Sequence, residues 1–374
     1  MKVLFVQDTL INAGTEKSLL NILPYVTSNL EAKVVYLYPR HDLQEDYSRA
    51  GISMIFLDLK GKYDFVNGIK KLFKLVKVEE PDLLVSSLLR SNLLSRFVSY
   101  KTGIPLVGTF VSDSYHPDSN LSRTKSQRLK SGIFKILDKW SSNIPIKFIS
   151  NSEAIAKAHL KTLGVPFEKS VVVYRGRQIP SQSWSKPNNE FYTFLSYGRL
   201  IPLKGFEELI KAFSRVYQKF PQTQLIIYGE GNYRTQLEKL ILDLDLIDSV
   251  KLPGVNKEVT KELYKSDCFV FPSWYEGFSG SLVEAMLSGI PIIASDIPMN
   301  LEAISPDETA LTFPVKDLDA LAAKMVWAIQ NQNAMAELGK AAREVAKERF
   351  DIREIAAKYE QTLFDIYHES QATQ

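Results

Sequence analysis

Two glutamates, Glu276 and Glu284, frame a glycine-rich loop in the segment FVFPSWYEGFSGSLVEAMLSGIPIIA, residues 269–294. The apolar run that ends at Pro272 predicts a short buried strand, and the helical stretch after the loop ends at Gly289. A strand, glycine loop and helix in this order aim backbone N–H groups and the positive helix end at an anion, commonly a phosphate. A carboxylate beside a bound phosphate would repel it. We therefore expect both glutamates to face hydroxyl groups, as a sugar or a ribose would offer.

Two cations, Arg199 and Lys204, follow another apolar run at 192–197, in the sequence GRLIPLKG. Two cations at the end of a strand can stabilise the negative charge that develops on a departing diphosphate. Arginine and lysine in such loops are otherwise ordinary surface residues. Glutamates spaced as Glu276 and Glu284 are likewise often solvated, so the interpretation depends on these motifs occurring together.

The two segments together resemble the signature motifs of retaining glycosyltransferases of family 4, which have the two-domain GT-B fold. The Glu-x7-Glu pair with EGF, GSLVEAM and SGIP resembles one motif, and GRLIPLKG resembles another. The resemblance covers essentially the whole chain and is strongest in residues 196–296. It implies transfer of a sugar from a nucleotide-diphosphate sugar to an acceptor with retention at the anomeric carbon. In the family no side-chain nucleophile is established: the diphosphate assists its own departure, and the acceptor attacks from the same face.

The resemblance also implies roles for individual residues. Arg199 and Lys204 would stabilise the diphosphate, and Glu276, the third residue expected to be catalytic, would hold sugar hydroxyls. Glu284 would bind the ribose hydroxyls, and the segment around 250–255 would border the base. The substrate-binding positions expected in this half are Gly198, Gly229, Leu252, Gly254, Val255, Gly277, Phe278, Ser279, Gly280, Ser281, Leu282 and Glu284.

Near the N-terminus, the loop at 12–16 follows an apolar run at 2–6. It is similar to the Gly-Gly-x-Glu turn of the same family, with Ala13 at the first glycine. That similarity implies that Gly14 approaches the substrate and that Glu16 lies on the acceptor side. A simple strand-to-helix turn is the alternative.

Two departures from the family pattern concern substrate choice. After the run 105–110 the family places a histidine that contacts the donor sugar near its sixth carbon, whereas this chain has Val111. Either Asp113 or His116 replaces that contact, or the donor lacks it, which would be consistent with a 6-deoxy or otherwise modified sugar.

The second departure replaces the family's Asn-Gly-x-Asp with Arg175-Gly176-Arg177-Gln178. Arg175 and Arg177 indicate an acidic or phosphate-bearing acceptor, with ordinary surface charge as an equally good explanation.

Apolar runs alternate with helical patterns along the 374 residues, which predicts an α/β protein with two parallel, doubly wound, Rossmann-like domains facing a cleft. We expect an N-terminal acceptor domain, a polar linker, a C-terminal nucleotide-sugar domain, and a last helix that returns to the first domain. Their expected bounds are 1–180, 181–190, 191–350 and 351–374.

The charge is divided unevenly. Residues 1–180 hold 26 Lys and Arg against 16 Asp and Glu, a net charge of +10, whereas residues 181–374 carry −7. Two basic amphipathic segments, 65–80 and 123–140, lie in the basic half. Such segments can bind an anionic membrane surface, or they can be solvated faces over an ordinary core.

A hydrophobic fraction of 45% and a charged fraction of 24% are ordinary for a soluble globular protein. The single cysteine, Cys268, excludes an intramolecular disulfide and fits a reducing compartment. Because Cys268 lies in an apolar run, we expect its side chain to be buried in the core and not to be a reactive thiol. No apolar run reaches transmembrane length and no secretory signal is recognisable, so we expect a cytoplasmic protein, with peripheral attachment to the inner face of a membrane left open.

The partners expected are a UDP- or GDP-sugar donor and a glycan, lipid-linked or other glycoconjugate acceptor, with no cofactor and no metal. Nucleic acid is not expected, because the basic residues are not interleaved with aromatics in a recognisable module. Two rival functions remain: a nucleotide-sugar epimerase or hydrolase of the same fold, and a catalytically idle scaffold that binds a sugar nucleotide.

Overall fold

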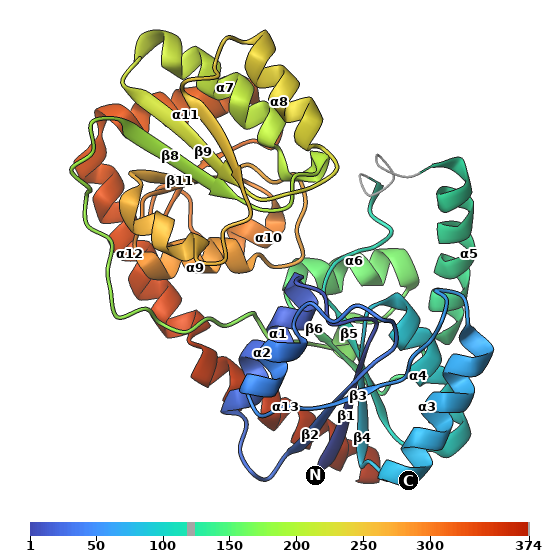
Figure 1. Ribbon diagram of the computed structural model, residues 1–374. Helices are drawn as coiled ribbons and strands as arrows, with labels where there is room; N and C mark the ends of the chain where they lie inside the picture. The colour runs from blue at the N-terminus through green and yellow to red at the C-terminus, as the bar shows by residue number, and fades with distance from the viewer. Residues whose placement is uncertain (118–123, 373–374) are drawn as a thin grey trace. The chain divides into compact units, whose positions relative to one another are not determined.

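The computed structural model of the protein describes residues 1–117 and 124–372. Arg123, the first residue of the second basic segment, and the last two residues of the expected C-terminal segment lie outside the described residues. The chain divides into two compact units (Figure 1). Unit 1 holds residues 1–116, 124–176 and 352–372, and unit 2 is built on residues 177–351.

Unit 1 contains a seven-stranded sheet in the order β3-β2-β1-β4-β5-β6-β7, in which all neighbouring strands are parallel. Its strands are β1 (Lys2–Gln7), β2 (Glu31–Tyr36), β3 (Ser53–Phe56), β4 (Leu83–Ser87), β5 (Leu106–Phe110), β6 (Lys147–Ser150) and β7 (Ser170–Val172). Its helices are α1 (Gly14–Ile22), α2 (Gln44–Arg49), α3 (Phe65–Glu79), α4 (Leu89–Thr102), α5 (Lys125–Ser141), α6 (Glu153–Leu163) and α13 (Ile352–Ala372).

The central strand β1 shows why this sheet is covered on both faces. Successive side chains of a strand point to opposite faces. Val3 and Phe5 pack in a core with residues of α1 and α13, whereas Leu4 and Val6 pack in a second core with residues of α3 and α4. A strand buried on both faces must be apolar throughout, which is why the run at 2–6 could be recognised as a central parallel strand.

Unit 2 contains a six-stranded parallel sheet in the order β10-β9-β8-β11-β12-β13. Its strands are β8 (Tyr192–Tyr197), β9 (Thr223–Tyr228), β10 (Val250–Gly254), β11 (Cys268–Phe271), β12 (Ile292–Ser295) and β13 (Leu311–Phe313). Its helices are α7 (Phe206–Lys219), α8 (Arg234–Asp243), α9 (Gly280–Ser288), α10 (Pro298–Leu301), α11 (Leu318–Gln330) and α12 (Gln332–Phe350).

The core of unit 2 is formed where α7 and α11 pack together on one face of the sheet, around Phe194, Phe213 and Met325. Cys268 is fully buried in β11, and burial raises the pKa of its thiol. The prediction of two doubly wound, parallel sheets with helices on their faces is therefore confirmed.

The segment 181–190 contains neither helix nor strand and is fastened to unit 2. The Trp184 backbone N–H donates to the carbonyl of Ser288 at 2.7 Å, and its indole N–H donates to the carbonyl of Ser266 at 2.8 Å. In the structure this stretch packs as part of unit 2, whereas the sequence predicted a linker.

Helix α13 belongs to unit 1 although it follows unit 2 in the chain. Its Ile355, Tyr359 and Leu363 lie in the same core as β1, and Glu360 accepts hydrogen bonds from the backbone and hydroxyl of Thr27. None of the helices among residues 1–117 and 124–372 is both long and apolar enough to cross a membrane.

Candidate active site

The order of strands in unit 2 identifies the edge of the sheet where a ligand is expected. β8 and β11 are neighbours at the centre, and the chain proceeds from them toward opposite edges of the sheet. In open α/β sheets ligands bind outside the carboxyl ends of the strands at this reversal point. The loops that leave β8 and β11 carry the Arg199–Lys204 and Glu276–Glu284 segments, so the structure brings both motifs to one place.

Gly205 allows these two loops to approach each other closely. Its φ is +66°, in the left-handed region, and a Cβ atom at this position would lie 2.1 Å from the carbonyl oxygen of Pro272. Only glycine satisfies both conditions without strain. The final glycine of GRLIPLKG is therefore explained by the contact between the loop after β8 and the loop after β11.

Lys204 and Glu276 form an ion pair across the two loops. Their side chains are 18% and 12% exposed, so the pair is largely shielded from water. Lys204 also lies over the ring of Phe271, with its ammonium nitrogen 5.8 Å from the ring centre. Arg199 differs, since it is exposed and its side chain makes no hydrogen bond or ion pair with any described residue. Arg199 is therefore a cation of this site whose side chain is available to a ligand.

Helix α9 begins at the end of the loop that follows β11, and its first backbone N–H groups are at this end of the helix. Ser279 occupies the N-cap position but its side chain makes no capping hydrogen bond. The first intrahelical bond runs from the Val283 N–H to the Ser279 carbonyl at 3.3 Å, so the N–H groups of Gly280, Ser281 and Leu282 have no partner within the helix. Phe278 packs edge-on against Phe350 and is buried, which leaves its backbone as the part that could contact a ligand.

Glu284, one turn into α9, is held by two side chains. Its Oε1 accepts a hydrogen bond from Arg177 Nε at 2.7 Å, and its Oε2 accepts one from the Tyr197 hydroxyl at 3.0 Å. Burial, and next the charge of Glu284, raise the pKa of Tyr197, so Tyr197 stays a neutral donor. The Arg177 guanidinium also covers Gly280, where a Cβ atom would collide with it. Arg177 thus lies beside Glu284 in unit 2, and the acceptor-side role expected for it from the sequence stays a prediction.

Two further loops, after β9 and β10, lie at the same edge of the unit 2 sheet. Gly229 follows β9 with φ +139°, and a Cβ atom there would lie 1.9 Å from the carbonyl oxygen of Gly198. Its N–H donates to the carbonyl of Gly254 at 2.8 Å, which ties the loops after β8, β9 and β10 together. The carbonyl of Leu252 accepts from Arg234, and Val255 is exposed. Leu252 lies within β10, and the other C-terminal-half positions expected to bind substrate lie at or beyond the carboxyl ends of β8, β9, β10 and β11.

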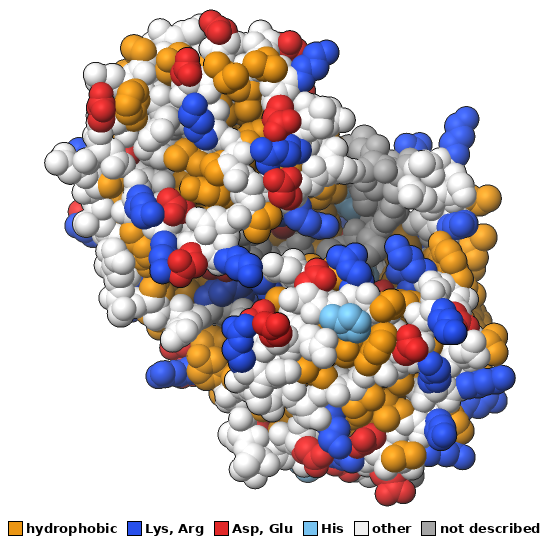
Figure 2. Space-filling view, viewed as in Figure 1, with side chains coloured by type: hydrophobic (Ala, Val, Ile, Leu, Met, Phe, Trp, Pro, Cys, Tyr) orange, Lys and Arg blue, Asp and Glu red, His pale blue; other side chains and the backbone are white. Residues whose placement is uncertain are grey.

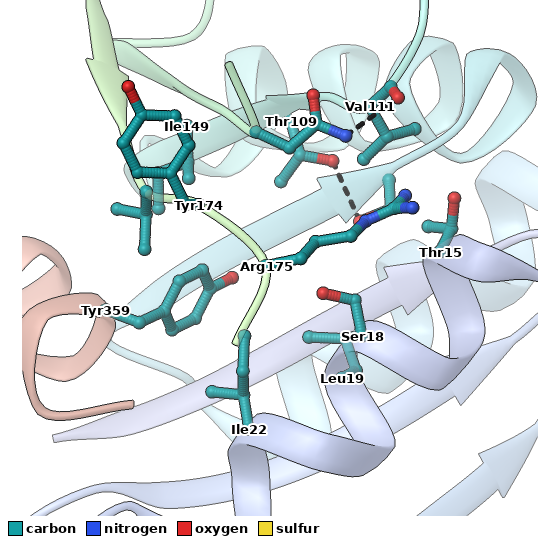
Figure 3. A pocket seen from close by; sticks show the side chains of 13 residues that line it. Thr15, Ser18, Leu19, Ile22, Thr109, Val111, Ile149, Tyr174, Arg175 and Tyr359 are labelled. Carbon is teal, nitrogen blue, oxygen red and sulfur yellow. Dashed lines mark hydrogen bonds between the residues drawn. The ribbon is translucent and has the colours of Figure 1, made fainter. Parts of the chain in front are cut away.

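In unit 1 the corresponding reversal point lies between β1 and β4. A pocket lies on this unit, lined by the start of α1, the ends of several strands and Tyr359 of α13 (Figure 3). Its polar lining is rich in hydroxyl groups, together with one amide and one guanidinium: Thr15, Ser18, Ser87, Thr109, Asn151, Tyr174 and Arg175.

Arg175 extends across this pocket toward α1 (Figure 3). A Cβ atom at Gly14 would lie 2.9 Å from Arg175 Nη1, so the guanidinium packs directly on the first residue of α1. Glu16, two residues on, is buried: its Oε1 accepts from the Thr9 hydroxyl at 3.0 Å. Burial raises the pKa of Glu16, and the nearby charge of Asp8 raises it further. The structure thus brings Gly14, Glu16 and Arg175 together.

Val111 lines the same pocket, and its carbonyl accepts a hydrogen bond from Asn151 at 2.9 Å. Asp113 lies outside the pocket lining and is buried; its carboxylate accepts from the Tyr115 N–H at 2.8 Å and from the Thr162 hydroxyl at 3.2 Å. Both of its oxygens therefore hold the loop after β5 in shape. His116 is half-buried, and its backbone N–H donates a hydrogen bond to the backbone carbonyl of Asp113.

Sequence reasoning missed Tyr197 and the hydroxyl lining of the unit 1 pocket. Tyr197 ends an apolar strand and gives no sign of a polar role. Ser87, Thr109 and Asn151 had a usable signal, because each stands at or just after the carboxyl end of a parallel strand. Among the residues that the structure describes, no three His, Cys, Asp or Glu side chains gather in a group that could hold a metal ion.

Two doubly wound parallel sheets, with a cation-bearing glycine loop and a glutamate-bearing helix at the reversal point of the second, define a protein of the GT-B fold class. The chain belongs to glycosyltransferase family 4, the glycosyl transferases group 1. The family model described as "Glycosyltransferase Family 4" matches residues 13–178, and the model described as "Glycosyl transferases group 1" matches residues 179–345.

Similar proteins agree with this assignment. An uncharacterized glycosyltransferase of Methanocaldococcus jannaschii is 40% identical over 105 residues, which is 28% of this chain and 26% of that protein. The O-antigen chain mannosyltransferase RfbU of Salmonella typhimurium is 29% identical over 217 residues, 55% of this chain and 58% of that protein. The chain thus spans well under two thirds of the length of these relatives. The crystal structure of Anabaena HepE in complex with UDP superposes with a TM-score of 0.83 at 21% identity, covering 98% of this chain and 100% of HepE.

Proposed function

We propose that the protein is a retaining glycosyltransferase that moves a sugar from a nucleotide-diphosphate sugar to a glycan, lipid-linked or other glycoconjugate acceptor. The observation that carries this proposal is the arrangement at the reversal point of unit 2. There an exposed Arg199, the Lys204–Glu276 ion pair, Glu284 and the N–H groups of α9 that have no partner within the helix lie on segments that follow two adjacent strands.

The donor is proposed to be a UDP-sugar, with a GDP-sugar as the second choice. Support comes from HepE, which has been crystallised with UDP and with UDP-glucose and has the same fold. In this chain, Glu284 would accept hydrogen bonds from the two ribose hydroxyls. Tyr197 and Arg177 hold its carboxylate in position, so part of the entropy of ordering this side chain is already lost before the nucleotide arrives.

The transfer step follows from where the charges lie. The bond between the anomeric carbon and the diphosphate oxygen breaks, the acceptor hydroxyl oxygen forms a bond to the same face of that carbon, and its proton passes to the departing phosphate oxygen. Arg199, Lys204 and the N–H groups of α9 stabilise the negative charge that develops on the diphosphate. Because these groups supply positive charge themselves, we propose a reaction that needs no metal ion.

Glu276 and the backbone of Gly277 and Phe278 are proposed to hold the sugar hydroxyls. The Lys204–Glu276 ion pair fixes the direction of the carboxylate, and one carboxylate can accept several hydrogen bonds at once. Val111, in place of a histidine, leaves an apolar lining at one point of the unit 1 pocket. We keep the proposal of an altered sugar, such as a 6-deoxy sugar, on this ground.

The acceptor is proposed to bind at the unit 1 pocket, where hydroxyl groups and Arg175 can bond a sugar or an acidic group. RfbU is named for acting on an O-antigen chain, which supports a surface polysaccharide or related glycan as the product. The single buried cysteine fits a reducing compartment, so we propose that the reaction takes place in the cytoplasm.

The test is a transfer assay on the purified protein with UDP-glucose, UDP-galactose, UDP-N-acetylglucosamine and GDP-mannose, each with and without a mixed glycan acceptor. Released nucleotide is measured, and the anomeric configuration of the product is read by NMR. We expect acceptor-dependent release and retention. Arg199→Ala and Lys204→Ala should each lower kcat by about 100-fold or more, because each removes a group aimed at transition-state charge.

Arg215→Ala is the matched control, because Arg215 is also a unit 2 cation but forms an exposed ion pair with Asp319. It should leave kcat unchanged. Nucleotide binding without release would favour the idle scaffold, release without an acceptor would favour a hydrolase, and an altered free nucleotide sugar would favour an epimerase. An inverted product would contradict the proposed stereochemistry.

A further inference from the structure

Helix α5 of unit 1 exposes the side of the helix that an ordinary surface helix buries. Leu129, Ile133, Ile136, Leu137 and Trp140 are each between 45% and 79% exposed. Four of them, Leu129, Ile133, Ile136 and Trp140, recur at spacings of four, three and four residues. At 3.6 residues per turn they fall within about 60° of arc on one side of the helix.

The opposite side of α5 explains why the helix is turned this way. Asp138 and Ser141 are buried, and both accept hydrogen bonds from Arg96 of α4, at 2.7 Å and 2.9 Å. The second oxygen of Asp138 accepts from the Tyr115 hydroxyl at 3.0 Å. Phe134, on this inner side, stacks with Tyr63 at 6.2 Å between ring centres. Arg96 is only 1% exposed, so rotating α5 to bury its apolar stripe would leave a buried cation without its carboxylate.

The second basic amphipathic segment of this half, α3, behaves in the opposite way. Its Leu72 and Val76 are buried in the core on the sheet, and Ile69 and Phe73 pack against that core. Lys71 donates to the carbonyls of Leu57 and Asp58 at 2.8 Å. From the sequence, both segments had the same two interpretations, and the structure separates them: α3 is a solvated face over a core, whereas α5 presents an apolar stripe to the surroundings.

Positive charge flanks this stripe. All the charged side chains on the exposed sides of α5 are basic, because its one acidic residue, Asp138, is buried and paired with Arg96. The basic residues are Lys125, Arg128, Lys130, Lys135 and Lys139. Figure 2 shows hydrophobic side chains beside Lys and Arg along the right-hand edge of unit 1, where Figure 1 draws α5.

We propose that this face of α5 docks on an anionic lipid surface. A helix with an apolar stripe and flanking lysines lies in the plane of a bilayer interface, with the stripe among the acyl chains and the cations against the headgroups. Trp140 lies on the stripe, and tryptophan side chains are enriched at the interface between membrane and water. A second copy of the chain is a poorer occupant, because two such faces would bring like charges together. The inference does not depend on the proposed reaction, since it concerns a different surface of the molecule.

The experiment measures sedimentation of the full chain with vesicles of phosphatidylcholine alone and of phosphatidylcholine with 40% phosphatidylglycerol, roughly at the surface charge of an anionic membrane. We expect binding to the anionic vesicles that weakens as salt rises. Ile133→Ser/Ile136→Ser should lower the partition coefficient at least about 10-fold, and Lys130→Ala/Lys135→Ala/Lys139→Ala on the order of 100-fold.

Two controls make the result specific to α5. Val66→Ser/Val78→Ser removes two equally exposed apolar side chains from α3 and should leave binding within about twofold of wild type. Trp140→Phe should keep the binding but abolish the blue shift of tryptophan emission on vesicle addition, because Trp140 is the tryptophan on the stripe.

Three results would overturn the proposal. They are no binding of the wild type to anionic vesicles, an equal loss in the α3 control, and a wild-type dimer that Ile133→Ser/Ile136→Ser dissociates. The last of these would assign the face to a second copy instead. Circular dichroism and thermal melting of each variant distinguish lost docking from lost folding.

Discussion

The contact between Arg177 and Glu284 gives the sharpest energetic prediction, because it joins a residue from the start of unit 2 to the helix of the Glu-x7-Glu motif. The two side chains are 16% and 23% exposed and 2.7 Å apart. A hydrogen bond between charged groups contributes about 1.5–3 kcal/mol, and partial exposure reduces this to about 1–2 kcal/mol. For a domain of about 175 residues, 1 kcal/mol corresponds to about 2–4 °C in Tm. Arg177→Gln should therefore lower the Tm of unit 2 by about 2–8 °C.

The assay is calorimetric melting of wild type, Arg177→Gln, Glu284→Gln and the double variant. Arg177 makes other contacts, and the double-mutant cycle cancels them. We expect the loss in the double variant to be smaller than the sum of the single losses by at least about 0.5 kcal/mol. The exposed pair Arg215 and Asp319 serves as the control, with a coupling expected below that value. Additive losses at Arg177 and Glu284, within about 0.3 kcal/mol, would refute the coupling.

Three further variants test other parts of the account. Gly205→Ala should destabilise unit 2 by at least about 1–2 kcal/mol in calorimetry, because left-handed backbone strain adds to a contact with the Pro272 carbonyl. Arg96→Met should destabilise unit 1 by about 3–5 kcal/mol by leaving Asp138 buried and unpaired, and Asp138→Asn in the same chain should recover part of that loss. Burial raises the pKa of Glu16, so the folded state holds this proton to a higher pH than the unfolded chain and loses stability as pH rises through that window. Glu16→Gln should then gain stability over wild type as pH rises above the usual range of a glutamic acid, measured by melting from pH 4 to 8; a constant difference would contradict the argument.

The fold and the motif residues were accessible from the sequence for a physical reason. Parallel strands covered on both faces are continuous apolar runs, and the glycines of the site are required by backbone approach, as at Gly205 and Gly229. Both leave a mark on the local sequence. The positions of Arg199, Lys204, Glu276 and Glu284 at one edge of the sheet follow from that local pattern.

The features that could not be predicted from the sequence depend on contacts between residues far apart in the chain. Arg177 and Glu284 are 107 positions apart, and nothing near either residue predicts their pairing. Which face of α5 is buried could not be predicted either, because an amphipathic pattern does not show which of its two faces packs against the protein. That choice is made by Arg96, a residue on another helix whose buried charge needs Asp138. The unit 1 pocket draws its lining from α1, α13 and four strand ends, so no single stretch of sequence describes it.

The central claim is that unit 2 binds a nucleotide diphosphate through Arg199 and Glu284. Its most direct test is thermal melting of the purified protein with UDP, GDP, ADP and TDP in the absence of metal. At one hundred times the Kd, a ligand that binds only the folded state stabilises it by about 2.7 kcal/mol, which is about 5–10 °C for a domain of this size. We predict such a shift for UDP, and its loss in Glu284→Ala and Arg199→Ala but not in Arg215→Ala. No shift with any of the four nucleotides, or an undiminished shift in Glu284→Ala and Arg199→Ala, would contradict the claim.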